Sequence, residues 1–278
     1  MQVLIAAVAV LLAAPPDGGA ELDAGVAVDA GVLEPPTPAA SLIAATAKRE
    51  YVEQLLADGK HYRFGTDDKG PVHVWRPSYY RAERASLVIY LHGFYNNADT
   101  AFFEHQLANQ FRDSGRNALF IVPEAPSWRT DNIIWTDLED LLRQTFARVK
   151  VRRPEGPMMV VAHSGAYRTL MMWLDHPKLK QVVLLDALYG GDREFQKWTE
   201  STVVPDKQLV MVGFDTAPKV EWFLRKHPAA VRLDDIPYIY DRLPQAAAPL
   251  LYLNSERFGH MEIVTDGHVL PFLLHSLP

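Results

Sequence analysis

Short, continuous apolar runs alternate with amphipathic segments along most of the chain. The runs are rich in Val, Ile, Leu and Met, and each is only four or five residues long. Such runs are typical of strands that are buried on both faces of a parallel sheet. They lie at residues 87–91, 118–122, 158–162, 182–185, 209–212 and 250–253.

Segments with helical spacing separate several of these runs. Apolar residues recur every three or four positions at residues 41–60, 100–112, 138–149 and 166–174, and His275 lies near the end of a closing helix. Two shorter strand candidates, at residues 61–64 and 72–75, follow the first of these helices. Strands that alternate with helices predict an α/β fold, in which a mostly parallel sheet is covered by helices on both faces.

The first 40 residues differ from the rest of the chain. Residues 3–14 form one apolar stretch, which is shorter than the roughly 20 residues that a membrane-spanning helix needs. No Lys or Arg precedes it, but small residues follow it, so residues 1–20 are interpreted as a signal peptide rather than a buried element. Residues 21–40 are rich in Pro, Ala, Gly and Asp and predict a linker. We therefore expect an exported protein, periplasmic or extracellular, with its folded domain at residues 41–278 and no stable membrane span after cleavage.

Charge and composition narrow the chemistry. The 278 residues include 28 Lys and Arg against 34 Asp and Glu, which gives a formal net charge of −6. With no long basic run, this balance argues against nucleic-acid binding. The chain has no Cys, which excludes disulfides, thiolate nucleophiles and Cys-ligated metal centres. No HExxH or EF-hand pattern is present, so neither a metal nor a cofactor is expected.

A serine follows the third apolar run, within the motif AHSGA at residues 162–166. A sharp turn from strand to helix can present a Ser hydroxyl only if the residues two positions away on each side are small. Ser164 would then lie at the start of a helix, where the N–H of Gly165 and the helix dipole favour a developing negative charge. An ordinary strand–helix turn is the alternative, but the preceding buried strand and the following helix favour a nucleophile.

A second turn, HGFYNN at residues 92–97, follows the first apolar run. We expect a second donor to the oxyanion hole in this turn, the N–H of Phe94 or of Tyr95. His92 is interpreted as shaping this turn by hydrogen bonding rather than as a base.

A general base and an acid are expected after later strands. His260 follows a Gly in the loop after the last apolar run, and His268 and His275 are its rivals. For the acid, Asp186 ends the run at residues 182–185 and Asp215 follows the run at 209–212. Either carboxylate could orient the imidazole and offset its charge.

Together these motifs resemble the α/β-hydrolase superfamily over about residues 70–278. The pieces that carry the resemblance are LVIYLHGFYNN, VVAHSGAYRTL, VVLLDALYG and FGHMEIV, each of which follows a strand in the expected order. The resemblance implies a Ser164 nucleophile, a His260 base and an Asp as the third member. Most of the superfamily carries the acid where Asp215 stands, whereas pancreatic-type lipases carry it one strand earlier, in a setting similar to LLDALYG. We favour Asp186 and keep Asp215 as the alternative.

The implied activity is that of an esterase-, lipase- or amidase-like serine hydrolase, working through an acyl-enzyme intermediate. Its substrate would be a small-molecule or cell-envelope ester or amide. Tyr189 and Phe214 are candidate substrate-binding residues, although such aromatics also suit a packed core. Two other classes remain as alternatives: a catalytically inactive binding protein of the same fold, and an interaction protein tethered to a membrane by the N-terminal apolar stretch.

Overall fold

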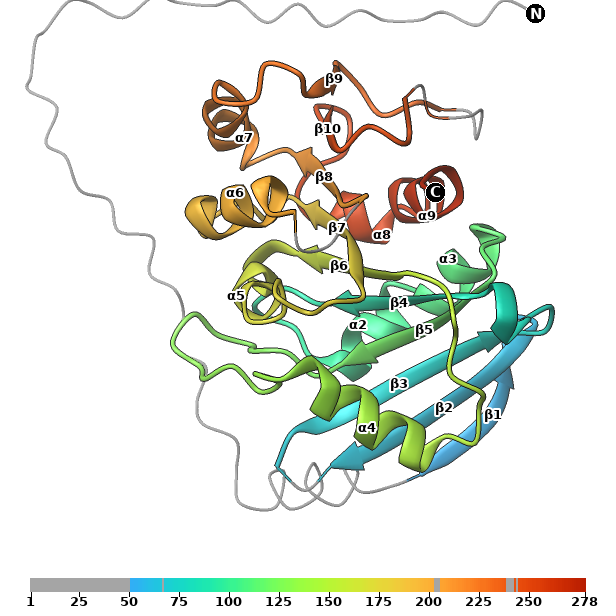
Figure 1. Cartoon of the computed structure of the whole chain (residues 1–278). Helices are drawn as coiled ribbons and strands as arrows, with labels where there is room; N and C mark the ends of the chain where they lie inside the picture. Colours follow the sequence, from blue (N-terminus) through green and yellow to red (C-terminus); the bar gives the residue numbers. More distant parts are fainter. Residues whose placement is uncertain (1–50, 67, 203–205, 239–242, 244) are drawn as a thin grey trace, which may run out of the picture. The chain divides into compact units, whose positions relative to one another are not determined.

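A twisted sheet of ten strands runs through the described part of the computed structural model (Figure 1). The structure describes residues 51–278, apart from 67, 203–205, 239–242 and 244. The strands are β1 (Val52–Leu56), β2 (Gly59–Thr66), β3 (Gly70–Pro77), β4 (Ser86–Leu91), β5 (Ala118–Pro123), β6 (Met158–His163), β7 (Leu179–Leu185), β8 (Gln208–Gly213), β9 (Val231–Leu233) and β10 (Leu250–Asn254). Each of the six apolar runs is a strand, and so are the two shorter candidates in β2 and β3.

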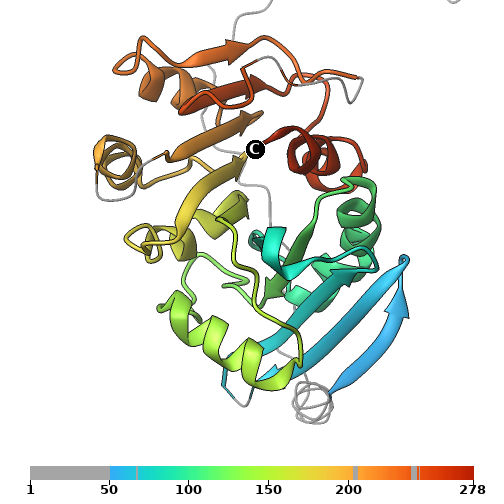
Figure 2. The same ribbon diagram turned by 45° about the vertical axis from the view of Figure 1, so that its right-hand side comes forward.

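The strand order is β1-β2-β3-β5-β4-β6-β7-β8-β10-β9. Along this order, the three pairings that join β1, β2, β3 and β5 are antiparallel. The remaining pairings, from β5–β4 to β10–β9, are parallel. Every residue of β4, β5, β6 and β8 is buried, as continuous apolar runs predict. The two edge strands, β1 in blue and β9 in orange, lie at opposite ends of the sheet (Figure 2).

Helices cover both faces of the sheet, which confirms the predicted fold class. One buried cluster joins the sheet to α4 (Leu138–Arg148), α5 (Tyr167–Met171), α6 (Asp192–Glu200) and α7 (Ala217–Leu224). A second cluster, on the other face, joins it to α2 (Ala98–Glu104), α3 (Leu107–Asp113), α8 (Glu262–Thr265) and α9 (Val269–Ser276). Two 3₁₀ turns, η1 (Ala82–Arg84) and η2 (Ser164–Ala166), complete the described elements. In Figure 1, α5, α6 and α7 lie to the left of the sheet, with α8 and α9 to its right.

The prediction of a helix at residues 41–60 is wrong for the part of this segment that the structure describes. Residues from Val52 onward form β1, which pairs antiparallel with β2. Ala57 and Asp58 both have positive φ, 50° and 56°, as a two-residue hairpin turn requires. The apolar spacing does not indicate a buried helix face here, because β1 is an edge strand in which Leu55 is 86% exposed. The apolar residues therefore do not mark a face of a helix.

The helix expected at residues 100–112 is divided into α2 and α3. Gln106 adopts a left-handed conformation, with φ 51°, between the two helices. The amide of buried Gln110 donates hydrogen bonds to the carbonyls of His105, at 2.7 Å, and of Val264, at 2.8 Å. The bond to His105 stabilises the break, because it satisfies a carbonyl that the end of α2 leaves without a partner in the helix.

The proposed signal peptide at residues 1–20 and linker at 21–40 lie outside the described residues and stay predictions. The described residues belong to the unit Pro38–Pro278. Within the part of the chain that the structure describes, every helix is too short or too polar to cross a membrane.

Candidate active site

Ser164 occupies the sharp turn between β6 and α5. Its φ is +52°, in the left-handed region that non-Gly residues rarely adopt. Ala162 and Ala166, on either side, are buried in the core, so larger side chains at these positions would collide with packed neighbours. The strained turn lifts the hydroxyl above the carboxyl end of the sheet, where loops converge.

His260 lies in the loop between β10 and α8, with its ring between a serine and a carboxylate. Its Nε2 lies 3.0 Å from Oγ of Ser164, and its Nδ1 lies 2.6 Å from Oδ2 of Asp186. Because an ionised carboxylate can only accept, Nδ1 carries the proton and Nε2 is free to accept from the serine hydroxyl. The loop is held by His163, whose Nε2 donates to the carbonyl of His260 at 3.0 Å.

Asp186 follows β7 directly and its side chain is fully buried. The loop after β8 wraps around its carboxylate. Oδ1 accepts from the N–H of Phe214 and from the N–H and hydroxyl of Thr216, at 2.6–2.9 Å. Burial alone would raise the pKa of this carboxyl, but the hydrogen bonds from His260, Thr216 and Phe214 outweigh it and hold the pKa below its usual range. Asp186 is therefore ionised at neutral pH.

The other candidates for base and acid lie elsewhere or farther away. The nearest carboxylate oxygen of Asp215 is 3.7 Å from Nδ1 of His260, and its side chain is 53% exposed. His268 precedes α9 and is hydrogen-bonded through Nε2 to the carbonyl of Pro237 at 2.7 Å. His275 is hydrogen-bonded through Nδ1 to the carbonyl of Ser114 at 3.0 Å. The structure thus brings together Ser164, His260 and Asp186.

The turn at residues 92–97, called the HG loop below, packs against the serine turn. A Cβ added to Gly93 would lie 2.7 Å from Cβ of Ser164, and one added to Gly165 would lie 2.5 Å from the ring of Phe94. Only glycine permits both close approaches. The N–H of Tyr95 donates to the carbonyl of Ser127 at 2.7 Å, so this group is already engaged.

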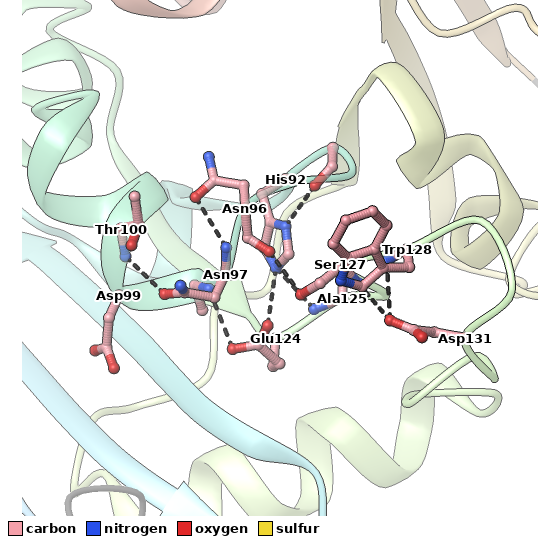
Figure 3. Close-up of polar contacts among 12 residues, drawn as sticks. His92, Asn96, Asn97, Asp99, Thr100, Glu124, Ala125, Ser127, Trp128 and Asp131 are labelled. Carbon is pink, nitrogen blue, oxygen red and sulfur yellow. Dashed lines mark hydrogen bonds and ion pairs between the residues drawn. The ribbon is translucent and has the colours of Figure 1, made fainter. Parts of the chain in front are cut away.

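His92 and Glu124 join the HG loop to the end of β5 (Figure 3). Nε2 of His92 accepts from the N–H of Ala125 at 2.9 Å, and its Nδ1 lies 2.9 Å from the carbonyl of Gly93. Nδ1 must therefore carry the proton. Oε2 of Glu124 accepts from the N–H of Ala98, the first residue of α2, at 3.1 Å. His92 thus lies where sequence reasoning placed it, as a shaper of the turn, whereas nothing in the sequence singled out Glu124.

A chain of hydrogen-bonded polar side chains, with the buried rings of His61 and His73 at its centre, was also not predicted from the sequence. Gln54 donates to Nδ1 of His61 at 3.1 Å, and Nε2 of His61 lies 2.9 Å from Nδ1 of His73. Nε2 of His73 lies 2.9 Å from Asp99, which also accepts two bonds from Arg63 at 2.6 and 2.7 Å. The chain runs from β1 through β2 and β3 to the second residue of α2, so it holds α2 on the sheet.

A pocket of about 420 Å³ opens at the serine. It is lined by Phe94, Arg129, Ser164, Gly165, Tyr167 and Tyr189. The Tyr189 hydroxyl donates to Asp215 at 3.4 Å, and its ring meets that of His260 edge-on with centroids 6.2 Å apart. Phe214 is 41% exposed but is not among the lining residues. Of the two candidate substrate-binding aromatics, the pocket therefore includes Tyr189.

One group of metal-ligand type occurs among the described residues: Asp186, Asp215 and His260 have ligand atoms within 4.8 Å of one another. Both oxygens of Asp186 already accept hydrogen bonds, and Nδ1 of His260 faces it. This donor set is therefore better explained as an acid–imidazole pair than as a metal site.

Comparisons with known proteins agree with this fold. No family model and no curated protein sequence matches the chain. The structure is similar to the S-formylglutathione hydrolase of Agrobacterium tumefaciens, with a TM-score of 0.53 and 10% identity, over 82% of this chain and 99% of that one. It also matches a feruloyl esterase module of Clostridium thermocellum (TM-score 0.49, 12% identity, 82% and 89% of the two chains) and the fluorophosphonate-binding serine hydrolase FphF of Staphylococcus aureus (0.49, 10%, 81% and 98%).

At this level of identity the first likeness concerns the fold alone. Taken with the strand order and the position of the serine turn, it identifies the architecture as the α/β-hydrolase fold. The fold that the resemblance in the sequence implies is thus confirmed.

Proposed function

We propose that the protein is a serine hydrolase that cleaves an ester or amide bond through Ser164, His260 and Asp186. One observation carries the proposal: the imidazole of His260 bridges the Ser164 hydroxyl, at 3.0 Å, and the Asp186 carboxylate, at 2.6 Å. This is the arrangement that activates a serine nucleophile, because the base is within reach of the hydroxyl proton and is itself oriented by a buried acid.

In the proposed reaction Oγ of Ser164 attacks the carbonyl carbon while Nε2 of His260 takes the hydroxyl proton. Asp186 offsets the positive charge that the ring acquires and keeps the proton on Nδ1. The ring then passes the proton to the leaving group, and an acyl-serine forms. Water, deprotonated by the same ring, attacks the acyl-serine and restores the hydroxyl.

The negative charge of the tetrahedral intermediate requires hydrogen-bond donors beside Ser164. We assign these to the main-chain N–H groups of Gly165 and Phe94, since that of Tyr95 is engaged with Ser127. The close packing of Gly93 on Ser164 places the start of the HG loop at the nucleophile. Such preorganised donors are worth about 10²–10³-fold in kcat each.

The fold adds general support, because a protein of similar fold is named as a hydrolase. Retention of serine, base and acid within hydrogen-bonding distance weighs against an inactive binding protein, since such a protein would not need all three.

A fluorophosphonate probe tests the proposal directly. We expect it to label the folded protein at Ser164, as identified by mass spectrometry of peptides. Ser164→Ala should abolish the labelling and the hydrolysis of 4-nitrophenyl acetate, and circular dichroism should show that the variant is folded. If the well-folded wild-type protein is neither labelled nor active, the proposal is wrong.

We further propose that the enzyme is exported and acts on small or cell-envelope esters or amides. The apolar stretch at residues 3–14 and the linker after it support export. Mass spectrometry of the chain recovered from its native cells should show a mature N-terminus near residue 20. A full-length chain in the cytoplasm would contradict this, and one held in the membrane would favour a tethered protein.

A further inference from the structure

Arg129 is one of the residues that line the pocket of Ser164. Among the residues that line the pocket, it is the one with a charged side chain. The remaining lining is aromatic or small. A cation at the wall of a pocket of about 420 Å³ can contact a small substrate that also reaches the serine.

The charge of Arg129 is not neutralised by an ion pair within the described part of the chain. Its side chain is exposed, and the acid nearest in sequence, Asp131, uses Oδ2 to accept from the N–H groups of Ser127 and Trp128 (Figure 3). The acids beside His260 are also engaged elsewhere, because Asp186 is enclosed by the loop after β8 and Asp215 accepts from Tyr189. An available cation in the pocket contrasts with the net charge of −6 of the whole chain.

The backbone that carries Arg129 is fixed on two sides. From α5, the guanidinium of Arg168 donates to the carbonyls of Arg129, at 2.7 Å, and of Asp131, at 3.0 Å. From the HG loop, the N–H of Tyr95 donates to the carbonyl of Ser127, whose hydroxyl in turn donates to the carbonyl of Asn96, both at 2.7 Å. Fixing the loop lowers the entropy that ligand binding costs, because only the side chain of Arg129 then has to be ordered.

We infer that Arg129 selects substrates bearing a carboxylate close to the bond that is cleaved. A guanidinium matches the two oxygens of a carboxylate, and such charge-assisted pairs are stronger than neutral hydrogen bonds. The aromatic walls formed by Phe94, Tyr167 and Tyr189 would contact the apolar part that joins the carboxylate to the ester. This inference rests on the proposed function and specifies its substrate class.

The test compares esters that differ in one negative charge. The first pair carries the charge on the acyl side: 4-nitrophenyl hydrogen adipate and its methyl ester. The second pair carries it on the leaving group: 4-carboxyphenyl acetate and its methyl ester. The readout is the ratio of kcat/KM for the anionic ester to that for the neutral ester, which cancels general losses of activity.

In at least one pair, Arg129→Gln should lower this ratio by about tenfold or more, as expected for loss of a hydrogen-bonded charge. Arg129→Lys should give a smaller loss, because the charge stays but the two-pronged geometry does not. Arg148→Gln is the matched control: it removes the same charge from an exposed position on α4 outside the pocket, and its ratio should equal that of the wild type. Equal ratios for wild type and Arg129→Gln in both pairs would overturn the inference.

A binding measurement separates this inference from the proposed function. Calorimetric titration of the two anionic esters into Ser164→Ala should show, for at least one of them, binding that is weakened about tenfold or more in Ser164→Ala/Arg129→Gln. Arg129-dependent binding, with neither turnover nor fluorophosphonate labelling of the wild type, would retain the inference and refute the hydrolase. Turnover of all four esters without a charge preference, combined with equal binding to the two variants, would support the hydrolase and overturn the inference about Arg129.

Discussion

The main-chain N–H of Asp215 donates a hydrogen bond to Oδ2 of Asp186, at 3.1 Å. Of the two carboxylates that the sequence offers as the acid, one thus supports the other through its backbone. Asp186 is fully buried and touches the ring of His260, whereas the side chain of Asp215 is 53% exposed. The effects of replacing the two residues should therefore differ greatly.

Asp186→Asn should lower kcat/KM for 4-nitrophenyl acetate by about 10³–10⁴-fold, because an amide no longer fixes the proton on Nδ1 of His260. Asp215→Asn keeps the main-chain donor and should cost less than about tenfold, since an exposed charge at 3.7 Å is screened by solvent. Steady-state kinetics of the two variants check this. A larger loss in Asp215→Asn than in Asp186→Asn would assign the acid to Asp215.

Gly93→Ala should lower kcat by about 100-fold or more. The added Cβ would lie 2.7 Å from Cβ of Ser164, so the HG loop has to move away and its N–H groups leave the developing oxyanion. Gly259→Ala is the control, because a Cβ there meets its nearest atom at 3.5 Å, an ordinary contact. Both variants should remain folded by circular dichroism. Wild-type kcat in Gly93→Ala would show that this loop does not stabilise the intermediate.

The stability of the protein should fall as the pH is lowered from about 6.5. Burial holds the pKa of His61 at about 3, with the neighbouring His73 as a further cause, and burial also holds the pKa of His163 at about 3. Between pH 6.5 and 3 the unfolded chain binds protons at these positions that the folded chain does not. Each histidine therefore removes about 1.4 kcal/mol of unfolding free energy per pH unit within this window, and nothing above it.

His61→Gln tests this assignment. Urea unfolding between pH 6.5 and 4.5 should give a slope of free energy against pH that is smaller than that of the wild type by about 1.4 kcal/mol per unit. The intercept at pH 7 shows any loss that is unrelated to protonation. An unchanged slope would mean that His61 does not resist protonation in the fold.

Arg116→Gln should lower the free energy of unfolding by about 2–4 kcal/mol. Its guanidinium donates to the carbonyls of Leu274, at 3.0 Å, and Leu277, at 2.8 Å, and so satisfies the C-terminal end of α9. Arg148→Gln, which removes an exposed arginine, should change the stability by less than about 0.5 kcal/mol. Chemical denaturation of both variants checks the difference, and equal stabilities would contradict it.

The parallel part of the fold was predictable because its signal is local. Strands such as β4 and β6 are buried on both faces, so each appears as an apolar run, and the residue after each run falls at the edge where chemistry gathers. Ser164 and His260 could be named for this reason. At the antiparallel edge β2 and β3 give only short strand signals, and β1, with its exposed Leu55, gives none and has the spacing of a helix.

Other features depend on contacts between residues that are distant in the sequence. The break at Gln106 requires the carbonyl of Val264, which lies 154 residues from Gln110. The position of the acid depends on which carboxylate the loop at residues 214–216 encloses. Glu124 belongs to no motif, and only the folded chain shows that it lies beside the HG loop.

Arg63 and His73, on β2 and β3, hold Asp99 at the start of α2, and the HG loop leads directly into that helix. A fluctuation that separates these strands would break the chain of histidines and remove one support of α2 at the end of the HG loop, leaving the bond from Ala98 to Glu124. We therefore expect local unfolding of the antiparallel edge to disturb the loop beside Ser164. Heat or proteolysis that begins at β1 to β3 should then abolish the proposed activity while the parallel strands are still paired.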